Sequence, residues 1–323
     1  MKRTMIFVFC SLFLLFACSQ VFGSDNWVYV LLEDSIHVFN SDSTEYAGEI
    51  ELSRSGAVKL FPTPGGKYVF ITFRSSSEVA VIDAESRSLT GFVTFPVYPQ
   101  TITFAEMGKR AFVSDSGSGD VYLYSHKQAD FQLDGVVEKG SRSESVLANR
   151  LGTRIYRPDE KSIEFIYLKD YSTLARIALP ESVGALSLSP DYRTIWIVGQ
   201  SEGKLIVIDE ERRRVAKRVK GSFASETPAY WNRLAVLLNS DRMGFTLFST
   251  RTFRESDTRA LIEPSLGIAL SESGELWSLT AGGVEINSVD DSDSGERISV
   301  SYGSLPKDIK AVVLRSGEGF ACF

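Results

Sequence analysis

Histidine, the side chain most often used for acid–base chemistry and zinc binding, is rare in this chain. The sequence contains two histidines, His37 and His126. Each falls on or beside a predicted strand in a different part of the sequence, so we do not expect the two side chains to share a site. The patterns Gly-x-Ser-x-Gly, His-Glu-x-x-His, Cys-x-x-Cys and the Walker loop do not occur. The sequence therefore identifies no catalytic residue, and we expect no cofactor and no metal.

One short segment matches a nucleophile motif in spacing alone. Ser201-Glu202-Gly203-Lys204 has the form Ser-x-x-Lys, a chemistry that places the serine and the lysine one helical turn apart. The segment instead reads as a hairpin loop between two apolar strands. We interpret it as an ordinary loop.

Two runs of charge invite a ligand interpretation. The acidic run 290–296 superficially resembles a calcium loop, but Gly295 occupies a ligand position and Tyr302 the place of the closing carboxylate. A solvated acidic hairpin explains it better. The basic run 212–218 is predicted to form the outermost strand of its repeat, where charge prevents edge-to-edge aggregation. Contact with lipid headgroups or an acidic partner is its alternative interpretation.

Composition places the chain among packed globular proteins. Of its 323 residues, 43% are hydrophobic and 24% charged, and the formal net charge is −6. This balance disfavours binding to a phosphate backbone, so nucleic acid is not an expected partner. Only three cysteines occur, at Cys10, Cys18 and Cys322, which excludes a framework of internal disulfides. Stability must come from packing.

A repeat of 40 to 44 residues organises the chain. A turn resembling Ser-Pro-Asp-Gly-Lys, followed by an apolar strand, recurs with its glycine position at Gly66, Gly108, Gly152, Tyr192, Asn232, Gly274 and Gly317. A period of this length is typical of the blades of a β-propeller. Large side chains shortly after the turn are expected to pack between blades: Phe70, Phe112, Tyr156, Trp196 and Trp277.

Counting the strands gives the number of blades. Seven segments have the character of a third strand in the repeat, beginning with Ser35–Phe39 and ending with Val284–Asn287. The first unit lacks its innermost strand, and Asp308–Leu314 has the character of the missing one. The sequence therefore predicts an all-β, seven-bladed propeller of four-stranded antiparallel blades, closed by pairing of the N- and C-terminal strands.

The repeats also resemble a known family. Lys67–Ile71 followed by Ser77–Asp83 is similar to the YVTN propeller repeat, as is Ser189-Pro190-Asp191 followed by Leu205–Asp209. The resemblance implies the propeller fold and leaves the function open, because propellers include enzymes, receptors and scaffolds. Asp83 and Asp209 end third strands, where an Asx-type turn accounts for them without a metal.

In a propeller, a small-molecule site is expected at the central mouth formed by the loops that lead into inner strands and the loops between second and third strands. Six polar residues from different repeats fall in such loops. The candidate ligand-binding residues are Arg54, Arg74, Asp115, Asp159, Glu202 and Asp241. Ordinary solvated loop residues would give the same pattern.

The N-terminus has the form of an export signal. Lys2 and Arg3 precede an apolar run from Met5 to Ala17, as in a secretory leader. Leu15-Phe16-Ala17-Cys18 resembles a lipobox, which implies a leader of residues 1–17, lipidation of Cys18 and a membrane anchor. Cleavage before Ser24 is the alternative, with a signal peptide of residues 1–23 and a soluble exported protein. We expect residues 24–323 to form a single propeller domain.

These features favour a non-catalytic binding or scaffolding propeller of the bacterial cell envelope, either membrane-anchored or periplasmic. Its partner, an envelope protein or a small molecule, is not identified by the sequence. One alternative is a lactonase-like hydrolase with a site in the central mouth, because sugar-lactone hydrolases are similar seven-bladed propellers. A surface adhesin is the other.

Overall fold

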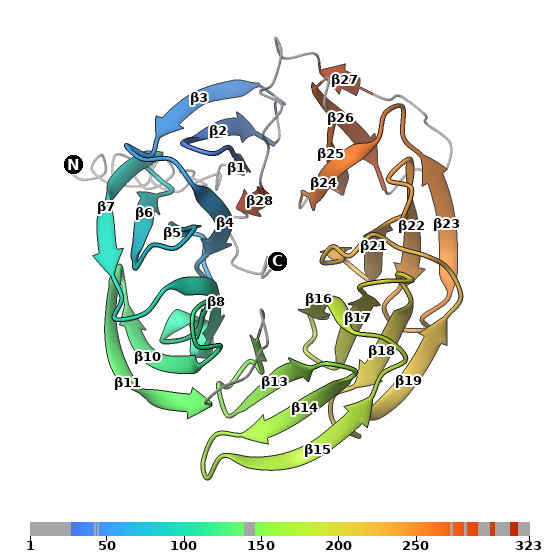
Figure 1. The fold of residues 1–323 in the computed structure, drawn as a ribbon. Helices are drawn as coiled ribbons and strands as arrows, with labels where there is room; N and C mark the ends of the chain where they lie inside the picture. The colour runs from blue at the N-terminus through green and yellow to red at the C-terminus, as the bar shows by residue number, and fades with distance from the viewer. Residues whose placement is uncertain are drawn as a thin grey trace, which may run out of the picture.

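The computed structural model describes residues 27–41, 43, 45–138, 146–271, 274–280, 283–289, 298–300 and 311–315. These residues form seven four-stranded antiparallel sheets arranged as blades around a common axis (Figure 1). The predicted seven-bladed, all-β fold is therefore confirmed. In the part of the chain that the structure describes, no helix has the length and apolar character needed to cross a membrane.

Each blade runs from an inner strand at the axis to an outer strand at the rim. Blade 1 comprises β28 (Ala311–Arg315), β1 (Trp27–Leu31), β2 (Ser35–Asn40) and β3 (Tyr46–Glu51); blade 2 comprises β4 (Ala57–Pro62), β5 (Tyr68–Phe73), β6 (Glu78–Asp83) and β7 (Ser88–Thr94). Blade 3 comprises β8 (Pro99–Ala105), β9 (Arg110–Asp115), β10 (Val121–Lys127) and β11 (Asp130–Glu138), with the short 3-10 helix η1 (Glu106–Gly108) between β8 and β9.

The remaining four blades follow the same order. Blade 4 comprises β12 (Leu147–Ala148), β13 (Arg154–Asp159), β14 (Ser162–Tyr167) and β15 (Ser172–Ala178); blade 5 comprises β16 (Val183–Leu188), β17 (Thr194–Gly199), β18 (Leu205–Asp209) and β19 (Arg214–Val219). Blade 6 comprises β20 (Ala229–Trp231), β21 (Leu234–Leu238), β22 (Gly244–Ser249) and β23 (Glu255–Ala260); blade 7 comprises β24 (Ser265–Leu270), β25 (Glu275–Thr280), β26 (Gly283–Ser288) and β27 (Ile298–Val300).

The ring closes through the first and last strands that the structure describes. β1 pairs antiparallel with β28, with Trp27 opposite Arg315 and Leu31 opposite Ala311. β28 is thus the inner strand of blade 1, as the sequence predicted. This pairing leaves no unpaired sheet edge between the beginning and the end of the ring.

The recurring turn has a conformation that explains its glycine. At the six described positions of the repeat, the residue has a positive φ: +63° at Gly66, +85° at Gly108, +60° at Gly152, +59° at Tyr192, +51° at Asn232 and +85° at Gly274. Glycine adopts this left-handed region without steric cost. The seventh position, Gly317, lies outside the described residues. The repeated turn therefore requires a left-handed residue at this position. Tyr192 adopts that conformation with steric strain, because it has a Cβ.

The hydrophobic core consists of seven clusters, each formed where two neighbouring blades face each other. The large side chains expected between blades are all fully buried: Phe70, Phe112, Tyr156, Trp196 and Trp277. Burying one such side chain contributes roughly 1.5–3 kcal/mol. Packing between blades, as predicted, therefore accounts for these aromatic residues.

Local side-chain contacts account for other residues that had suggested chemistry. The carboxylate of Asp83 accepts hydrogen bonds from the backbone N–H groups of Glu85 and Ser86, and that of Asp209 accepts one from Arg212. These are the predicted Asx-type turns. His37 lies in β2 and His126 in β10, in different blades. The acidic run 290–296 and Cys322 lie outside the described residues.

Candidate functional site

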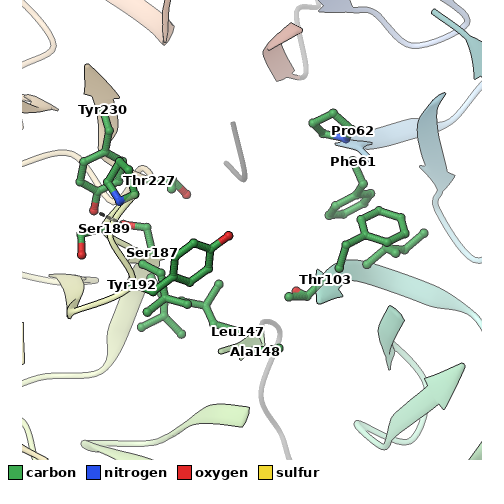
Figure 2. A pocket seen from close by; sticks show the side chains of 15 residues that line it. Phe61, Pro62, Thr103, Leu147, Ala148, Ser187, Ser189, Tyr192, Thr227 and Tyr230 are labelled. Atoms are coloured by element: carbon green, nitrogen blue, oxygen red, sulfur yellow. Dashed lines mark hydrogen bonds between the residues drawn. The ribbon is translucent and has the colours of Figure 1, made fainter. Parts of the chain in front are cut away.

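The inner strands of blades 2 to 6 enclose a cavity of about 90 Å³ near the axis of the ring (Figure 2). Most of its surface is apolar, with several hydroxyl groups between the apolar side chains. Its lining comprises Phe61, Pro62, Ile102, Thr103, Phe104, Leu147, Ala148, Leu186, Ser187, Leu188, Ser189, Pro190, Tyr192, Thr227 and Tyr230. Most of these residues lie in the second half of an inner strand or in the turn after it, so the cavity lies toward the mouth formed by those turns.

The polar groups of the cavity are neutral hydroxyls held in fixed positions. The hydroxyls of Ser187 and Tyr230 are 2.7 Å apart, and the Thr103 hydroxyl donates to the carbonyl oxygen of Val146 at 2.5 Å. Burial raises the pKa of the Tyr230 phenol, so it stays protonated at neutral pH. The described residues of the cavity therefore present shape and neutral hydrogen-bonding groups, and no charged group, to whatever occupies it.

Tyr192 is the residue at which the cavity departs from the repeat. Its side chain extends from the turn after β16 into the space between the walls of the cavity (Figure 2). Its φ of +59° places a bulky residue in the left-handed region that glycine occupies at four of the described repeats. Such strain costs on the order of 1–3 kcal/mol and accumulates at functional positions. Among the residues that line the cavity, Tyr192 is thus the one with a left-handed backbone.

The structure places the six residues predicted from the sequence at the opposite mouth. Arg54 lies in the loop between β3 and β4, and the other five lie in or at the start of the turn between the second and third strands of their blades: Arg74, Asp115, Asp159, Glu202 and Asp241. They share a face of the ring, as expected, but none of them lines the cavity described above. Their role in ligand binding stays a prediction.

Several of these side chains are held by neighbours on the same face. A guanidinium nitrogen of Arg54 lies 2.6 Å from the carboxylate of Glu78, and the ammonium of Lys204 lies 2.6 Å from that of Glu202. Asp159 forms an ion pair with Arg176. The carboxylate of Asp241 accepts the backbone N–H of Met243 at 2.9 Å. Arg74 is exposed at the end of β5. These contacts of Arg54, Asp159, Glu202 and Asp241 are with neighbouring protein groups, and they hold the side chains in place.

Asp115 joins two loops of blade 3. One carboxylate oxygen accepts the backbone N–H of Tyr98, and the other accepts the N–H and hydroxyl of Ser118. Burial raises the pKa of Asp115, but the hydrogen bonds from Ser118 and Tyr98 outweigh it and hold the pKa below its ordinary value. Asp115 is thus ionised at neutral pH and fixes the mouth of the ring.

Glu181 holds a loop at the same mouth of the ring in blade 5. The sequence alone did not identify this residue. It is 5% exposed, and its carboxylate accepts the backbone N–H groups of Ser201, Glu202 and Lys204 together with the Ser201 hydroxyl. The segment 201–204 is therefore a loop tied to Glu181, as the hairpin interpretation requires. Nothing in the local sequence around Leu179-Pro180-Glu181 distinguishes this carboxylate from a solvated one.

Metal ligands do not gather in the part of the chain that the structure describes: no group of three or more histidine, cysteine, aspartate or glutamate side chains is placed to hold an ion. His126 packs among aromatic rings, with its Nδ1 2.6 Å from the carbonyl oxygen of Gly108. His37 lies 3.7 Å from Glu49. The two histidines therefore have separate local partners.

Comparison with known proteins supports the fold. No family model matches the chain, and no curated protein matches it in sequence. The dihydro-heme d1 dehydrogenase NirN, solved in complex with DHE, is similar in structure, with a TM-score of 0.64 and 16% identity over 86% of this chain and 64% of that one. The likeness is one of fold. This chain thus spans less than two thirds of the NirN chain.

Two further solved structures are similar in fold. A functionally unknown protein from Desulfotomaculum acetoxidans has a TM-score of 0.71 and 10% identity, over 90% of this chain and 98% of its own. The hydrazine synthase of Kuenenia stuttgartiensis has a TM-score of 0.56 and 16% identity, over 73% of this chain and 77% of its own. At these identities the likeness carries no activity across. The assignment to the YVTN-repeat family stays a prediction.

Proposed function

We propose that this protein is a non-catalytic binding or scaffolding propeller of the bacterial cell envelope, and that it holds its ligand or partner in the cavity at the axis. The observation that carries the proposal is the lining of that cavity. Its side chains supply apolar surface and neutral hydroxyls, which provide shape and hydrogen bonds for a bound group. The rigid frame of seven blades holds them in place.

The envelope location rests on the sequence. Lys2 and Arg3 with the following apolar run favour export, and Cys18 in its lipobox-like context favours a lipid anchor. Residues 1–26 lie outside the described part of the chain. The intact mass of the mature protein from a bacterium with lipoprotein processing, compared with a Cys18→Ala variant, tests this point. A mass that corresponds to an acylated Cys18 supports the anchor, and an unmodified start at Ser24 supports soluble export.

A variant that fills the cavity tests the binding proposal. Thr227 is a half-buried lining residue, so Thr227→Trp should occupy the cavity. Thr252→Trp makes the same change at an exposed turn at the rim of blade 6 and serves as the control. We expect molecules that copurify with the native protein from envelope extracts, identified by mass spectrometry after mild crosslinking, to disappear in Thr227→Trp and persist in Thr252→Trp.

Two results would count against the proposal. One is a set of copurifying molecules that Thr227→Trp and Thr252→Trp retain equally. The other is turnover of a lactone panel by the native protein, with or without added divalent metal, which would favour the hydrolase. Digestion of intact cells with protease addresses the adhesin alternative, because a surface adhesin is cut and a periplasmic protein is not.

A further inference from the structure

A second concave site lies beside the cavity, on the face of the ring that carries the turns between first and second strands. It is a groove of about 690 Å³. Its lining comprises Glu106, Met107, Lys109, Asn149, Arg150, Leu151, Arg154, Tyr192 and Glu210. The groove thus joins the turns of blades 3, 4 and 5, and Tyr192 lines both it and the cavity at the axis.

Direct bonds between blades hold the floor and walls of this groove. The backbone N–H of Glu106 donates to the carbonyl oxygen of Arg150 at 3.0 Å, and the Arg110 guanidinium donates to the carbonyl oxygen of Gly152 at 3.2 Å. These two bonds fix the turn of blade 3 against the turn of blade 4. The groove is therefore formed before any ligand arrives, which lowers the entropic cost of binding.

Blade 5 is fixed to blade 4 by a largely buried polar network. The Glu210 carboxylate lies 3.0 Å from a guanidinium nitrogen of Arg154 and accepts the hydroxyl of Tyr156 at 2.5 Å. Burial, together with the hydrogen bond to Glu210, raises the pKa of the Tyr156 phenol and keeps its proton in place. The turns of blades 3 and 4, and the turn between β18 and β19 in blade 5, are thus held by side-chain or backbone bonds.

Two apolar side chains at this groove are exposed to an unusual degree. Met107 and Leu151 are each 65% exposed, more than any other large hydrophobic side chain among the described residues. Met107 also has a left-handed backbone, with φ of +56° between +51° at Glu106 and +85° at Gly108. Three consecutive left-handed residues form a strained turn. Exposed apolar side chains on two neighbouring turns that are fixed to each other are typical of an interaction surface.

The charge of the groove indicates what it binds. Glu106 is paired with Arg110 at 3.3 Å, and Glu210 with Arg154 at 3.0 Å. The exposed side chains of Lys109 and Arg150 form no ion pair with a described residue. Two positive charges are therefore left uncompensated beside the apolar pair. Their complement is a group that combines carboxylates with large apolar side chains.

We propose that this groove is a docking site for a partner polypeptide segment in which acidic residues lie next to large apolar ones. The concave shape favours a segment of chain over a bilayer, which presents a flat surface. Met107 and Leu151 contact the apolar side chains, and Lys109 and Arg150 neutralise the carboxylates. The proposal rests on the proposed scaffolding function and gives it a partner of defined chemistry.

A random dodecapeptide library displayed on phage, selected on the purified protein, provides the probe. We expect the enriched peptides to combine aspartate or glutamate with large apolar residues. The affinity of a labelled enriched peptide is then measured by fluorescence anisotropy. We expect Arg150→Glu and Met107→Asn each to weaken its binding about tenfold or more. Asparagine tolerates the left-handed backbone at Met107, so this variant keeps the turn.

Matched controls lie at the opposite mouth. Lys161→Glu reverses an exposed charge in the turn between β13 and β14, and Ile262→Asn replaces an exposed apolar residue in the loop before β24. Both should leave peptide affinity unchanged. Thr227→Trp separates this proposal from that of the cavity, because it blocks the cavity and should leave peptide affinity unchanged. Circular dichroism checks that each variant is folded.

Three results would overturn the proposal. The first is no enrichment over a blank surface, or enriched peptides without acidic residues. The second is equal peptide affinity for the native protein, Arg150→Glu and Met107→Asn. The third is binding to phosphatidylglycerol vesicles, but not to pure phosphatidylcholine vesicles, that depends on Arg150 and Met107 while no peptide binds, which would assign the surface to a membrane.

Discussion

Glu181 offers the sharpest test of how the mouth of the ring is held together. Its buried carboxylate accepts the backbone N–H groups of Ser201, Glu202 and Lys204 at 2.9, 2.7 and 3.0 Å, and the Ser201 hydroxyl at 2.7 Å. Glu181→Gln keeps the size of the side chain, removes its charge and turns an amide N–H₂ toward at least one of these donors. The loop 201–204 then loses a partner that it cannot replace from within the fold.

The size of the effect follows from the kind of bond that is lost. A hydrogen bond to a charged group contributes about 1.5–3 kcal/mol, and leaving a buried donor unsatisfied costs a similar amount. Because four donors share one carboxylate, these contributions are not additive. We expect Glu181→Gln to lower the free energy of unfolding by about 2–4 kcal/mol at neutral pH.

The matched control is Glu202→Gln. Glu202 is exposed and pairs with the half-exposed Lys204, an ion pair that contributes little to stability because water screens it. Urea unfolding followed by tryptophan fluorescence gives both values under one set of conditions. If Glu181→Gln and Glu202→Gln lose the same stability within about 0.5 kcal/mol, the assignment of Glu181 as the residue that holds the loop is wrong.

Acidification gives an independent check. Burial raises the pKa of Glu181, but the hydrogen bonds from Glu202, Ser201 and Lys204 outweigh burial and hold the pKa below its ordinary value. The stabilisation is therefore present above the pKa of an unfolded glutamate, about 4.3, and is lost as the pH falls through the lower folded-state pKa. The stability difference between wild type and Glu181→Gln should shrink over that acidic range. A difference that stays constant there would contradict the charge-based explanation.

Three further changes test other parts of the fold. Burial holds the pKa of His126 below its ordinary value, so stability should fall as the pH drops below about 6.5; His126→Phe should remove that part of the pH dependence of urea unfolding. A Cβ at Gly274, where φ is +85°, would lie 2.8 Å from the indole ring of Trp231. Gly274→Ala should therefore lower the free energy of unfolding by about 1–3 kcal/mol. Asn232→Gly, at the equivalent turn, should change it by less than about 1 kcal/mol, and thermal unfolding measures both. Arg54→Gln should cost about 1 kcal/mol or less by losing the half-exposed pair with Glu78, and a far larger loss in calorimetry would contradict that estimate.

The architecture could be predicted because it repeats. Each blade must return through the same left-handed turn, so glycine or a substitute appears at that turn in the described blades, and large side chains such as Phe70 and Trp196 follow it at a fixed distance. Closure of the ring followed from one missing strand in the first unit. Because the same turn and the same buried position recur in successive blades, the repeat can be recognised in a single sequence.

The candidate site could not be predicted in the same way. The cavity brings together Phe61, Thr103 and Tyr230 from three blades. The repeat places Phe61 and Thr103 at equivalent positions, five residues before the turn glycine. Every blade has such a position, so the spacing does not single out the residues that line a cavity. The groove left one signal: Met107 and Leu151 both precede the turn glycine in successive repeats, a position at the surface where an apolar residue is unusual. Charged residues such as Asp115 instead drew attention to the opposite mouth, where the structure gives that carboxylate a structural role.

Closure of the ring through β28 also constrains the order in which the protein can fold. Trp27 pairs opposite Arg315, so blade 1 stays incomplete until β28 has reached β1, whereas the other six blades are each built from consecutive strands. Native contacts between such distant residues form late and slowly. A chain cut short by a nonsense codon or a protease keeps an open strand that invites aggregation. A closed ring therefore requires a chain that includes β28.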